Sequence, residues 1–271
     1  MTVRTFYWNP VVSRPLWRRW ARPATVEFTH GNAGDRFNVD LLDWAYPHES
    51  IQNVDTGRRL LLVGSVAHRI ATGDVVNGIG AKLPTLPSAD EARVVVRGVR
   101  GPKTLRLFAE AGHDVSGLEF MGDPGLLIAH LYPEVMRVEP EPNRAIFIPH
   151  YRERGAFSST DQYDVVDIDA LPRDIATQIR QAEVVHTSSL HGLIWAHALG
   201  RPAHLVLPRT AEPAFKYEDY LASVGLPFEA HESIEVSLRA TTAASPPDLT
   251  SHIAAITLPS RELLESARII T

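Results

Sequence analysis

Two histidines follow predicted strands, and parallel α/β proteins usually place their catalytic residues at such strand ends. His150 follows a short apolar run, and His191 lies in the turn at 187–192, which joins a predicted strand to a predicted helix. The dipole of a first helical turn opposes an imidazolium, whereas a bound dianion would favour it. His191 could therefore gain its proton only when substrate arrives and act as a general acid. The alternative is a histidine that only packs against its neighbours.

Arg100 ends another predicted strand, directly before a helix that begins at Pro102. A guanidinium at such a point can hold a carboxylate or phosphate bidentately, while the helix N-terminus adds partial positive charge. Pairing with a local acid at the surface is the alternative. Arg100 is therefore our candidate ligand for an anionic substrate.

Glycine-containing loops follow two further predicted strands. Residues 30–35 read His-Gly-Asn-Ala-Gly-Asp, and residues 77–80 read Asn-Gly-Ile-Gly. Glycine permits a close backbone approach, and free N–H groups at a helix start attract anions. The first loop lacks the third glycine of a dinucleotide fingerprint and could instead be a turn in which Asp35 caps the helix. Candidate substrate ligands from these loops and from the turn at 187–192 are Asn32, Gly34, Asn77, Gly78, Gly80, Ser188, Ser189 and Leu190.

Several classes of site are missing from the sequence. There is no cysteine, the 12 histidines show no zinc-ligand spacing, and neither a Gly-x-Ser-x-Gly elbow nor a phosphate loop occurs. The net charge of -5 offers no general attraction to nucleic acid. We therefore expect no metal, no cofactor and no nucleic-acid partner.

The elements that must position these residues alternate along the chain. β-Branched runs alternate with helical patterns, which predicts an α/β fold with mostly parallel sheets. Strands are predicted at 25–29, 60–63, 74–77, 93–96, 145–149, 163–168, 183–187 and 203–208. Helices are predicted at 35–44, 102–111, 172–182, 189–199 and 215–224, with two short ones after Pro246.

A proline-rich stretch at 132–144 interrupts this pattern at mid-chain. It predicts two Rossmann-like lobes, residues 1–134 and 143–271, which face each other across a cleft. The first lobe opens with a basic and aromatic arm that contains Arg4, Arg14, Arg18, Arg19, Arg22, Phe6, Tyr7, Trp8, Trp17 and Trp20. We expect the arm to pack on the domain, or alternatively to clamp an anionic lipid or sugar carrier at a membrane surface. No apolar run is long enough to cross a bilayer.

Taken in order, the loops resemble those of the polysaccharide pyruvyltransferase family. The segments that carry the resemblance are Gly31-Asn32-Ala33-Gly34-Asp35, Asn77-Gly78-Ile79-Gly80, Gly98-Val99-Arg100-Gly101-Pro102-Lys103-Thr104, Gly122-Asp123-Pro124, Pro149-His150, Thr187-Ser188-Ser189-Leu190-His191-Gly192 with Gly200-Arg201-Pro202, and Lys216-Tyr217-Glu218-Asp219. The resemblance implies a fold of the glycosyltransferase-B kind, and it places Arg100 and His191 at the family's essential arginine and histidine. Lys216 joins the candidate ligands on the same basis. The chain departs from the family pattern at Ala33, where an aromatic residue is usual, and in its shorter length.

The resemblance implies transfer of pyruvate from phosphoenolpyruvate to two hydroxyls of one sugar residue, which forms a cyclic ketal and releases phosphate. Either His150 or Asp35 would then be the base for the attacking hydroxyl. A nucleotide-sugar-dependent glycosyltransferase and a non-catalytic glycan-binding relative are the alternatives, since fold alone does not choose the chemistry. We expect a cytoplasmic protein whose partners are phosphoenolpyruvate and a sugar acceptor, with or without a carrier lipid. The arm would supply any peripheral contact with the inner membrane face.

Overall fold

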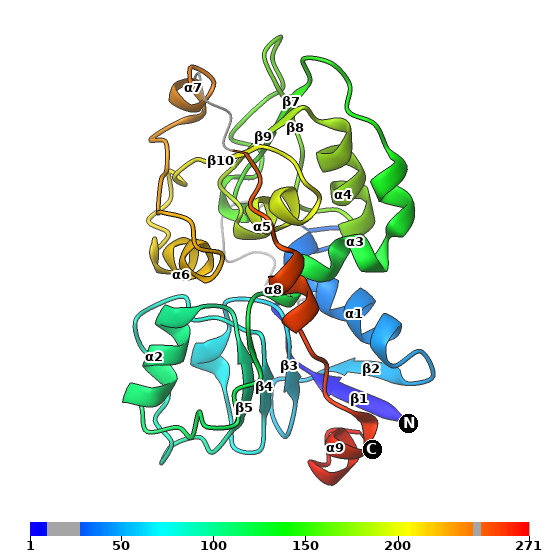
Figure 1. Ribbon diagram of the computed structural model, residues 1–271, viewed down its shortest axis with the longest axis vertical. Coiled ribbons are helices and arrows are strands. Elements are labelled where there is room, and N and C mark those ends of the chain that lie inside the picture. The colour runs from blue at the N-terminus through cyan, green and yellow to red at the C-terminus, as the bar shows by residue number, and fades with distance from the viewer. Residues whose placement is uncertain (10–27, 241–244, 271) are drawn as a thin grey trace, which may run out of the picture.

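The computed structural model describes residues 1–9, 28–240 and 245–270, and it contains two parallel sheets with helices around them (Figure 1). The first sheet has the order β2-β1-β3-β4-β5-β6, and the second has the order β10-β9-β7-β8. All strand pairs within these two sheets are parallel. The arrangement confirms the predicted α/β fold with two Rossmann-like lobes. The strands are β1 (Thr2–Thr5), β2 (Ser50–Asn53), β3 (Leu60–Leu61), β4 (Val75–Asn77), β5 (Val95–Val99), β6 (Phe120–Met121), β7 (Ala145–Ile148), β8 (Asp164–Val165), β9 (Val184–Thr187) and β10 (Ala203–Leu205).

Several helices begin where the sequence provides a cap or a proline. The Asn32 side chain accepts from the Gly34 amide at the start of α1, and the Ser189 side chain accepts from the Gly192 amide at the start of α5. Proline opens α2 and α4, as suits the first helical turn. The helices are α1 (Ala33–Ala45), α2 (Pro102–Glu110), α3 (Ile128–Leu131), α4 (Pro172–Gln181), α5 (Leu190–Ala198), α6 (Phe215–Ser223), α7 (Ile234–Ser237), α8 (Thr250–Ala255) and α9 (Arg261–Ser266). None of the helices in the described residues has the length and apolar character needed to span a membrane.

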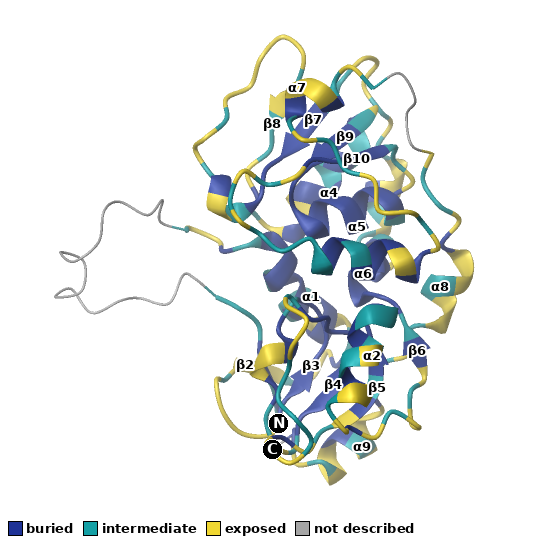
Figure 2. Cartoon of the chain, turned by 90° about the vertical axis from the view of Figure 1, so that its left-hand side faces the viewer, coloured by how far each residue is buried: buried dark blue, intermediate teal, exposed yellow. Residues whose placement is uncertain are grey.

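The two lobes share one apolar core. Phe37 of α1 and Trp195 of α5 have no exposed surface, and their rings lie 5.7 Å apart. Both helices are largely buried between the sheets (Figure 2). Because each helix belongs to a different half of the chain, this contact fixes the two sheets relative to each other.

The N-terminus differs from the predicted arm. Residues Thr2–Thr5 form β1, which pairs with both β2 and β3 inside the first sheet. Val3 and Thr5 alternate inward along this strand, but four residues are too few to stand out as a period in the sequence. The arm residues Arg14, Trp17, Arg18, Arg19, Trp20 and Arg22 lie outside the described residues, as does most of the strand predicted at 25–29.

The C-terminal tail does not stay with the second sheet. The Arg4 amide donates to the Ile269 carbonyl over 3.1 Å, and the Tyr46 hydroxyl donates to the Pro259 carbonyl over 2.6 Å. Figure 1 accordingly shows α9 beside β1. Residues 257–270 therefore lie against the first sheet, and the buried Leu264 joins the core there. The sequence had instead assigned all of 143–271 to the second lobe. The division at 134 and 143 stays a prediction.

Candidate active site

A cavity of about 240 Å³ lies between the lobes. Most of the lining on one side follows β1 and β3, and most of it on the other follows β7 and β9. Lys82, which follows β4, and Glu212 and Lys216, which follow β10, complete it. Both pairs of strands flank a point where the strand order reverses, since β1 lies between β2 and β3, and β7 lies between β8 and β9. Parallel α/β sheets bind their ligands at such switch points. The cavity is thus placed by the topology of both lobes.

The first turns of α1 and α5 meet at this cavity. Asn32, Asp35, Ser189, Leu190 and His191 all line it. Gly34 contributes by its lack of a side chain, because a Cβ there would lie 2.1 Å from Nδ1 of His191. The structure thus brings together the first glycine loop and the turn at 187–192, as the sequence predicts.

His191 is neutral in this environment. Its side chain is 7% exposed, and its Nε2 finds no hydrogen-bond partner among the described residues. Burial, followed by the nearby Arg100 and Lys216 charges, lowers the pKa of His191 to about 3. A bound anion would oppose all three effects, so the imidazole can gain a proton together with an anionic ligand.

Among the carboxyl groups that line the cavity, that of Asp35 has the pKa closest to neutral pH. Burial raises the pKa of Asp35 to about 7, against the lowering effect of Lys216 and Lys82. The side chain is 8% exposed and lies in the first turn of α1. A group of this kind can take or give a proton near neutral pH.

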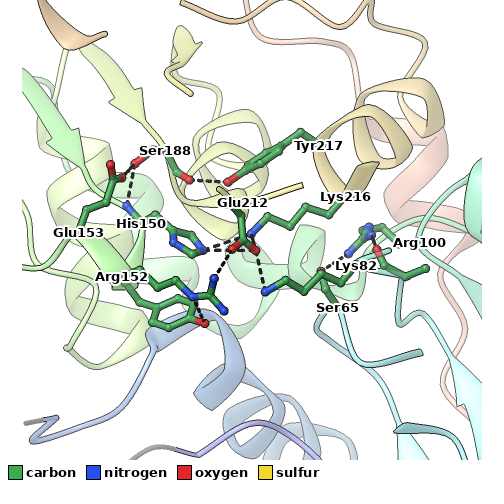
Figure 3. A network of polar contacts seen from close by, with 12 residues as sticks. Ser65, Lys82, Arg100, His150, Arg152, Glu153, Ser188, Glu212, Lys216 and Tyr217 are labelled. Atoms are coloured by element: carbon green, nitrogen blue, oxygen red, sulfur yellow. Dashed lines mark hydrogen bonds and ion pairs between the residues drawn. The ribbon is translucent and has the colours of Figure 1, made fainter. Parts of the chain in front are cut away.

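A cluster of cations surrounds Glu212 (Figure 3). Its carboxylate lies 2.9 Å from Lys82 Nζ, 2.8 Å from Lys216 Nζ and 3.3 Å from Arg152 Nη1. Lys82 comes from the first lobe and the other residues from the second. Burial lowers the pKa of Lys216 to about 8, although Glu212 raises it. Three cations around one carboxylate leave a net positive charge, which suits an anionic ligand.

His150 adjoins this cluster. Its Nε2 lies 3.2 Å from Nζ of Lys216, and its backbone amide donates to the Ser188 hydroxyl over 2.7 Å. That hydroxyl donates in turn to Glu153 over 2.7 Å. Burial and the Lys216 charge lower the pKa of His150 to about 3. Ser188 is fully buried, so it positions the His150 loop from behind the cavity wall.

Arg100 lies behind the cavity wall. It has no exposed surface, and its guanidinium donates to Asp219 over 3.2 Å, to the Ser65 hydroxyl over 2.8 Å and to the Ala81 carbonyl over 2.7 Å. Ser65 lines the cavity in its place. Direct contact between Arg100 and an anion stays a prediction. Among the described residues, the lysines and arginines that line the cavity are Arg69, Lys82 and Lys216.

The second glycine loop also has packing contacts instead of a cavity position. Asn77 donates to the Thr257 carbonyl over 2.9 Å, a Cβ at Gly78 would lie 2.3 Å from Pro124, and one at Gly80 would lie 2.0 Å from Arg100. This loop follows β4, and β3 lies between β4 and the switch point at β1 and β3. Lys82, a few residues further along, does reach the cavity, so the packing contacts and not the strand position keep residues 77–80 away from it.

Sequence reasoning missed Lys82 and Glu212. Each is a charged residue in a loop that follows a strand, Lys82 after β4 and Glu212 after β10. Their place after strand ends is a signal that could have drawn attention to them. Neither belongs to a recognisable motif, however, and only the folded chain shows that they meet.

Comparison with known proteins agrees with the resemblance. The family model for polysaccharide pyruvyl transferase matches residues 90–208. The chain is 31% identical over 229 residues to the succinoglycan biosynthesis protein ExoV of Rhizobium meliloti (strain 1021), which covers 81% of this chain and 69% of that protein. The chain belongs to the polysaccharide pyruvyl transferase family.

Two further matches were found for the transferase. It is 30% identical over 211 residues to an uncharacterized protein of Acanthamoeba polyphaga mimivirus, covering 72% of this chain and 71% of that protein. A solved structure of an uncharacterized Klebsiella pneumoniae protein matches with a TM-score of 0.44 and 12% identity, over 71% of this chain and 84% of that one. Within the transferase, the family match includes His150 and His191 but ends before Glu212.

Proposed function

We propose that this transferase moves the pyruvate unit of phosphoenolpyruvate onto two hydroxyls of one sugar residue, forming a cyclic ketal and releasing phosphate. The observation that carries the proposal is the inter-lobe cavity, in which Lys82 and Lys216 lie beside the start of α5. By extension from ExoV, the acceptor belongs to the synthesis of an exopolysaccharide. The reaction would take place in the cytoplasm, on a sugar that is free or linked to a carrier lipid.

The donor would bind through charge and helix geometry. Phosphoenolpyruvate carries a phosphate and a carboxylate, and ammonium groups and helix N-termini bind such anions. Lys82 and Lys216 supply the charge, and the first turn of α5 supplies the backbone amides. We assign no role to a metal or cofactor, because these groups provide the positive charge that the reaction needs.

The chemistry requires one acid and one base. His191, protonated when the donor binds, would give its proton to C3 of the donor and leave an oxocarbenium-like centre at C2. The first sugar hydroxyl adds to C2 while its proton passes to the base. The bond between C2 and the phosphate oxygen then breaks, and phosphate leaves with the electron pair and takes the proton held by the base. The second hydroxyl closes the ring while its proton returns to His191. Of the two candidate bases, Asp35 has the pKa nearer to neutral pH, at about 7.

A direct assay tests the proposal. The protein is incubated with phosphoenolpyruvate and methyl galactosides, glucosides and mannosides, and phosphate release and the mass of the glycoside are followed. We expect His191→Gln to bind phosphoenolpyruvate normally in calorimetry while kcat falls by about 10²- to 10⁴-fold. A rise in melting temperature with nucleotide sugars but not with phosphoenolpyruvate would contradict the proposal and favour a glycosyltransferase.

A further inference from the structure

Two aromatic rings from different lobes meet at the cavity. Trp8 follows β1 in the first sheet, and Tyr151 follows β7 in the second. Their ring centroids lie 4.7 Å apart, with planes inclined by 45°. Both residues line the cavity and both are half-buried. Each side of the cavity thus contributes one ring, again from a strand at the point where the strand order reverses.

The rings continue directly into the charged part of the cavity. The His150 ring lies 4.4 Å from that of Tyr151, and its Nε2 lies 3.2 Å from Nζ of Lys216. The sequence of contacts therefore runs from Trp8 through Tyr151 and His150 to Lys216. One end of this series is aromatic, and the other is cationic.

The two ends suit two different substrates. An anionic donor needs the lysines, whereas a sugar ring carries hydroxyls at its edge and an apolar face of C–H groups. Trp and Tyr offer large rigid surfaces that combine an apolar body with a polar tip, and ordering them costs little conformational entropy. The Tyr151 ring already has the Arg152 guanidinium at 5.6 Å from its centroid. The ring of Trp8 makes an edge contact with that of Phe28, with the ring centroids 5.8 Å apart. Trp8 is therefore the better candidate to pack against the face of a sugar.

We propose that Trp8, supported by Tyr151, is the platform on which the pyranose ring of the acceptor stacks. The inference rests on the proposed function, which it extends from the donor to the acceptor. A stacked pyranose would lie next to His150 and close to the bound donor. Trp8 is then a residue that sets acceptor affinity without contributing to donor binding.

The experiment compares Trp8→Ala and Trp8→Phe with Trp44→Ala, a control in which an exposed tryptophan of α1 outside this cavity is removed. Phosphate release gives KM separately for phosphoenolpyruvate and for the best methyl glycoside of the panel. We expect Trp8→Ala to raise the glycoside KM by about tenfold or more, as loss of one aromatic contact would. Trp8→Phe should have a smaller effect, and Trp44→Ala none. The KM for phosphoenolpyruvate should stay within about twofold of wild type.

An unchanged glycoside KM in Trp8→Ala, or an equal rise in both KM values, would overturn the proposal. Trp8→Phe keeps an aromatic ring and serves as the test if Trp8→Ala does not fold. Saturation-transfer NMR with the methyl glycosides separates this proposal from the proposed function, because it measures sugar binding without turnover. Glycoside signals that depend on Trp8, in a protein that releases no phosphate, would support the platform and reject the reaction. Absence of glycoside binding to the wild type would reject the platform.

Discussion

At the scale of single residues, burial acts oppositely on the proposed acid, His191, and on Asp35, one of the two candidate bases. It raises the pKa of Asp35 to about 7 and lowers that of His191 to about 3, because in each case it disfavours the charged form. Near neutral pH the empty site therefore holds a neutral imidazole and a partly ionised carboxyl group. Arrival of an anion would raise both pKa values, which protonates His191 and moves the titration of Asp35 to higher pH.

Replacing Asp35 by Asn tests its role as the base. We expect kcat to fall by about 10²- to 10⁴-fold, since the amide cannot accept the hydroxyl proton. In the wild type, activity should rise with pH through a limb at or above about pH 7, where the carboxylate forms, and the variant should lack this limb. Rates measured across pH check both points. Asp43→Asn, at an exposed position of the same helix, is the control, and a limb that falls instead of rising would assign Asp35 as a proton donor.

Glu212 influences the protonation of its neighbour Lys216. The carboxylate raises the pKa of this lysine, which burial otherwise lowers. A lysine that binds an anion must be protonated, so kcat/KM for phosphoenolpyruvate should fall as pH rises through its pKa of about 8.

Removing that carboxylate should shift this pH dependence. In Glu212→Gln we expect the alkaline limb of kcat/KM to move to lower pH, by up to about one unit, because Lys216 loses a nearby negative charge. The matched control is Glu218→Gln, whose carboxylate pairs with Lys103 instead. A limb at the same pH in Glu212→Gln and wild type would show that Lys216 does not bind the donor as a cation.

At the scale of elements, the site depends on the contact between the starts of α1 and α5. Gly34 allows it, because any Cβ at this position would overlap the imidazole of His191, at 2.1 Å from Nδ1. The overlap also includes Cβ of His191, at 2.8 Å, which rotation of the side chain does not move. The contact therefore constrains both the position of the histidine and the packing of the two helix starts.

Gly34→Ala should lower both activity and stability. We expect kcat to fall by about tenfold or more as the imidazole moves, since small displacements of catalytic groups are costly. The melting temperature should fall as well, because the overlap with Cβ of His191 is relieved only when one of the two helix starts moves. Circular dichroism and phosphate release measure the two quantities. The control Gly117→Ala adds a Cβ whose nearest neighbour lies 3.8 Å away. An unchanged melting temperature in Gly34→Ala would show that the helix starts can move apart without loss of stability.

At the scale of the whole molecule, the tail and the shared core join segments that are distant in the sequence. Val3 of β1 bridges to Ile270, and the Arg58 guanidinium donates to the Ala267 carbonyl over 3.1 Å. Leu264 is fully buried in the core cluster that also contains Val3. The tail is thus part of the first lobe, and we expect its loss to destabilise that lobe.

Leu264→Ala measures this contribution. Truncation of a fully buried leucine costs about 2 to 5 kcal/mol, so the free energy of unfolding should fall by that amount in urea denaturation. Leu83→Ala, at a side chain that is 48% exposed, should stay within about 0.5 kcal/mol of wild type. A loss below about 1 kcal/mol for Leu264→Ala would mean that the tail opens independently of the sheet.

Local sequence signals predicted the five longer helices and the two loops that meet, but not the short strands β1, β2 and β6. Capping by Asn32 and Ser189 and proline at the start of α2 and α4 are local effects, so the helix starts could be predicted within a residue or two. The first glycine loop and the turn around His191 carry family motifs in order, and the structure brings them to one cavity.

Which charged residues reach that cavity depends on long-range packing. Arg100 lies in a stronger motif than Lys82 or Glu212, but it follows β5, which lies far from the switch point. Its guanidinium is engaged in hydrogen bonds to Asp219, Ser65 and the Ala81 carbonyl. The return of the tail to β1 is likewise a long-range contact without a local signal. Strand order and burial determine both outcomes, because they depend on which distant segments pack together and not on the spacing of residues along the chain.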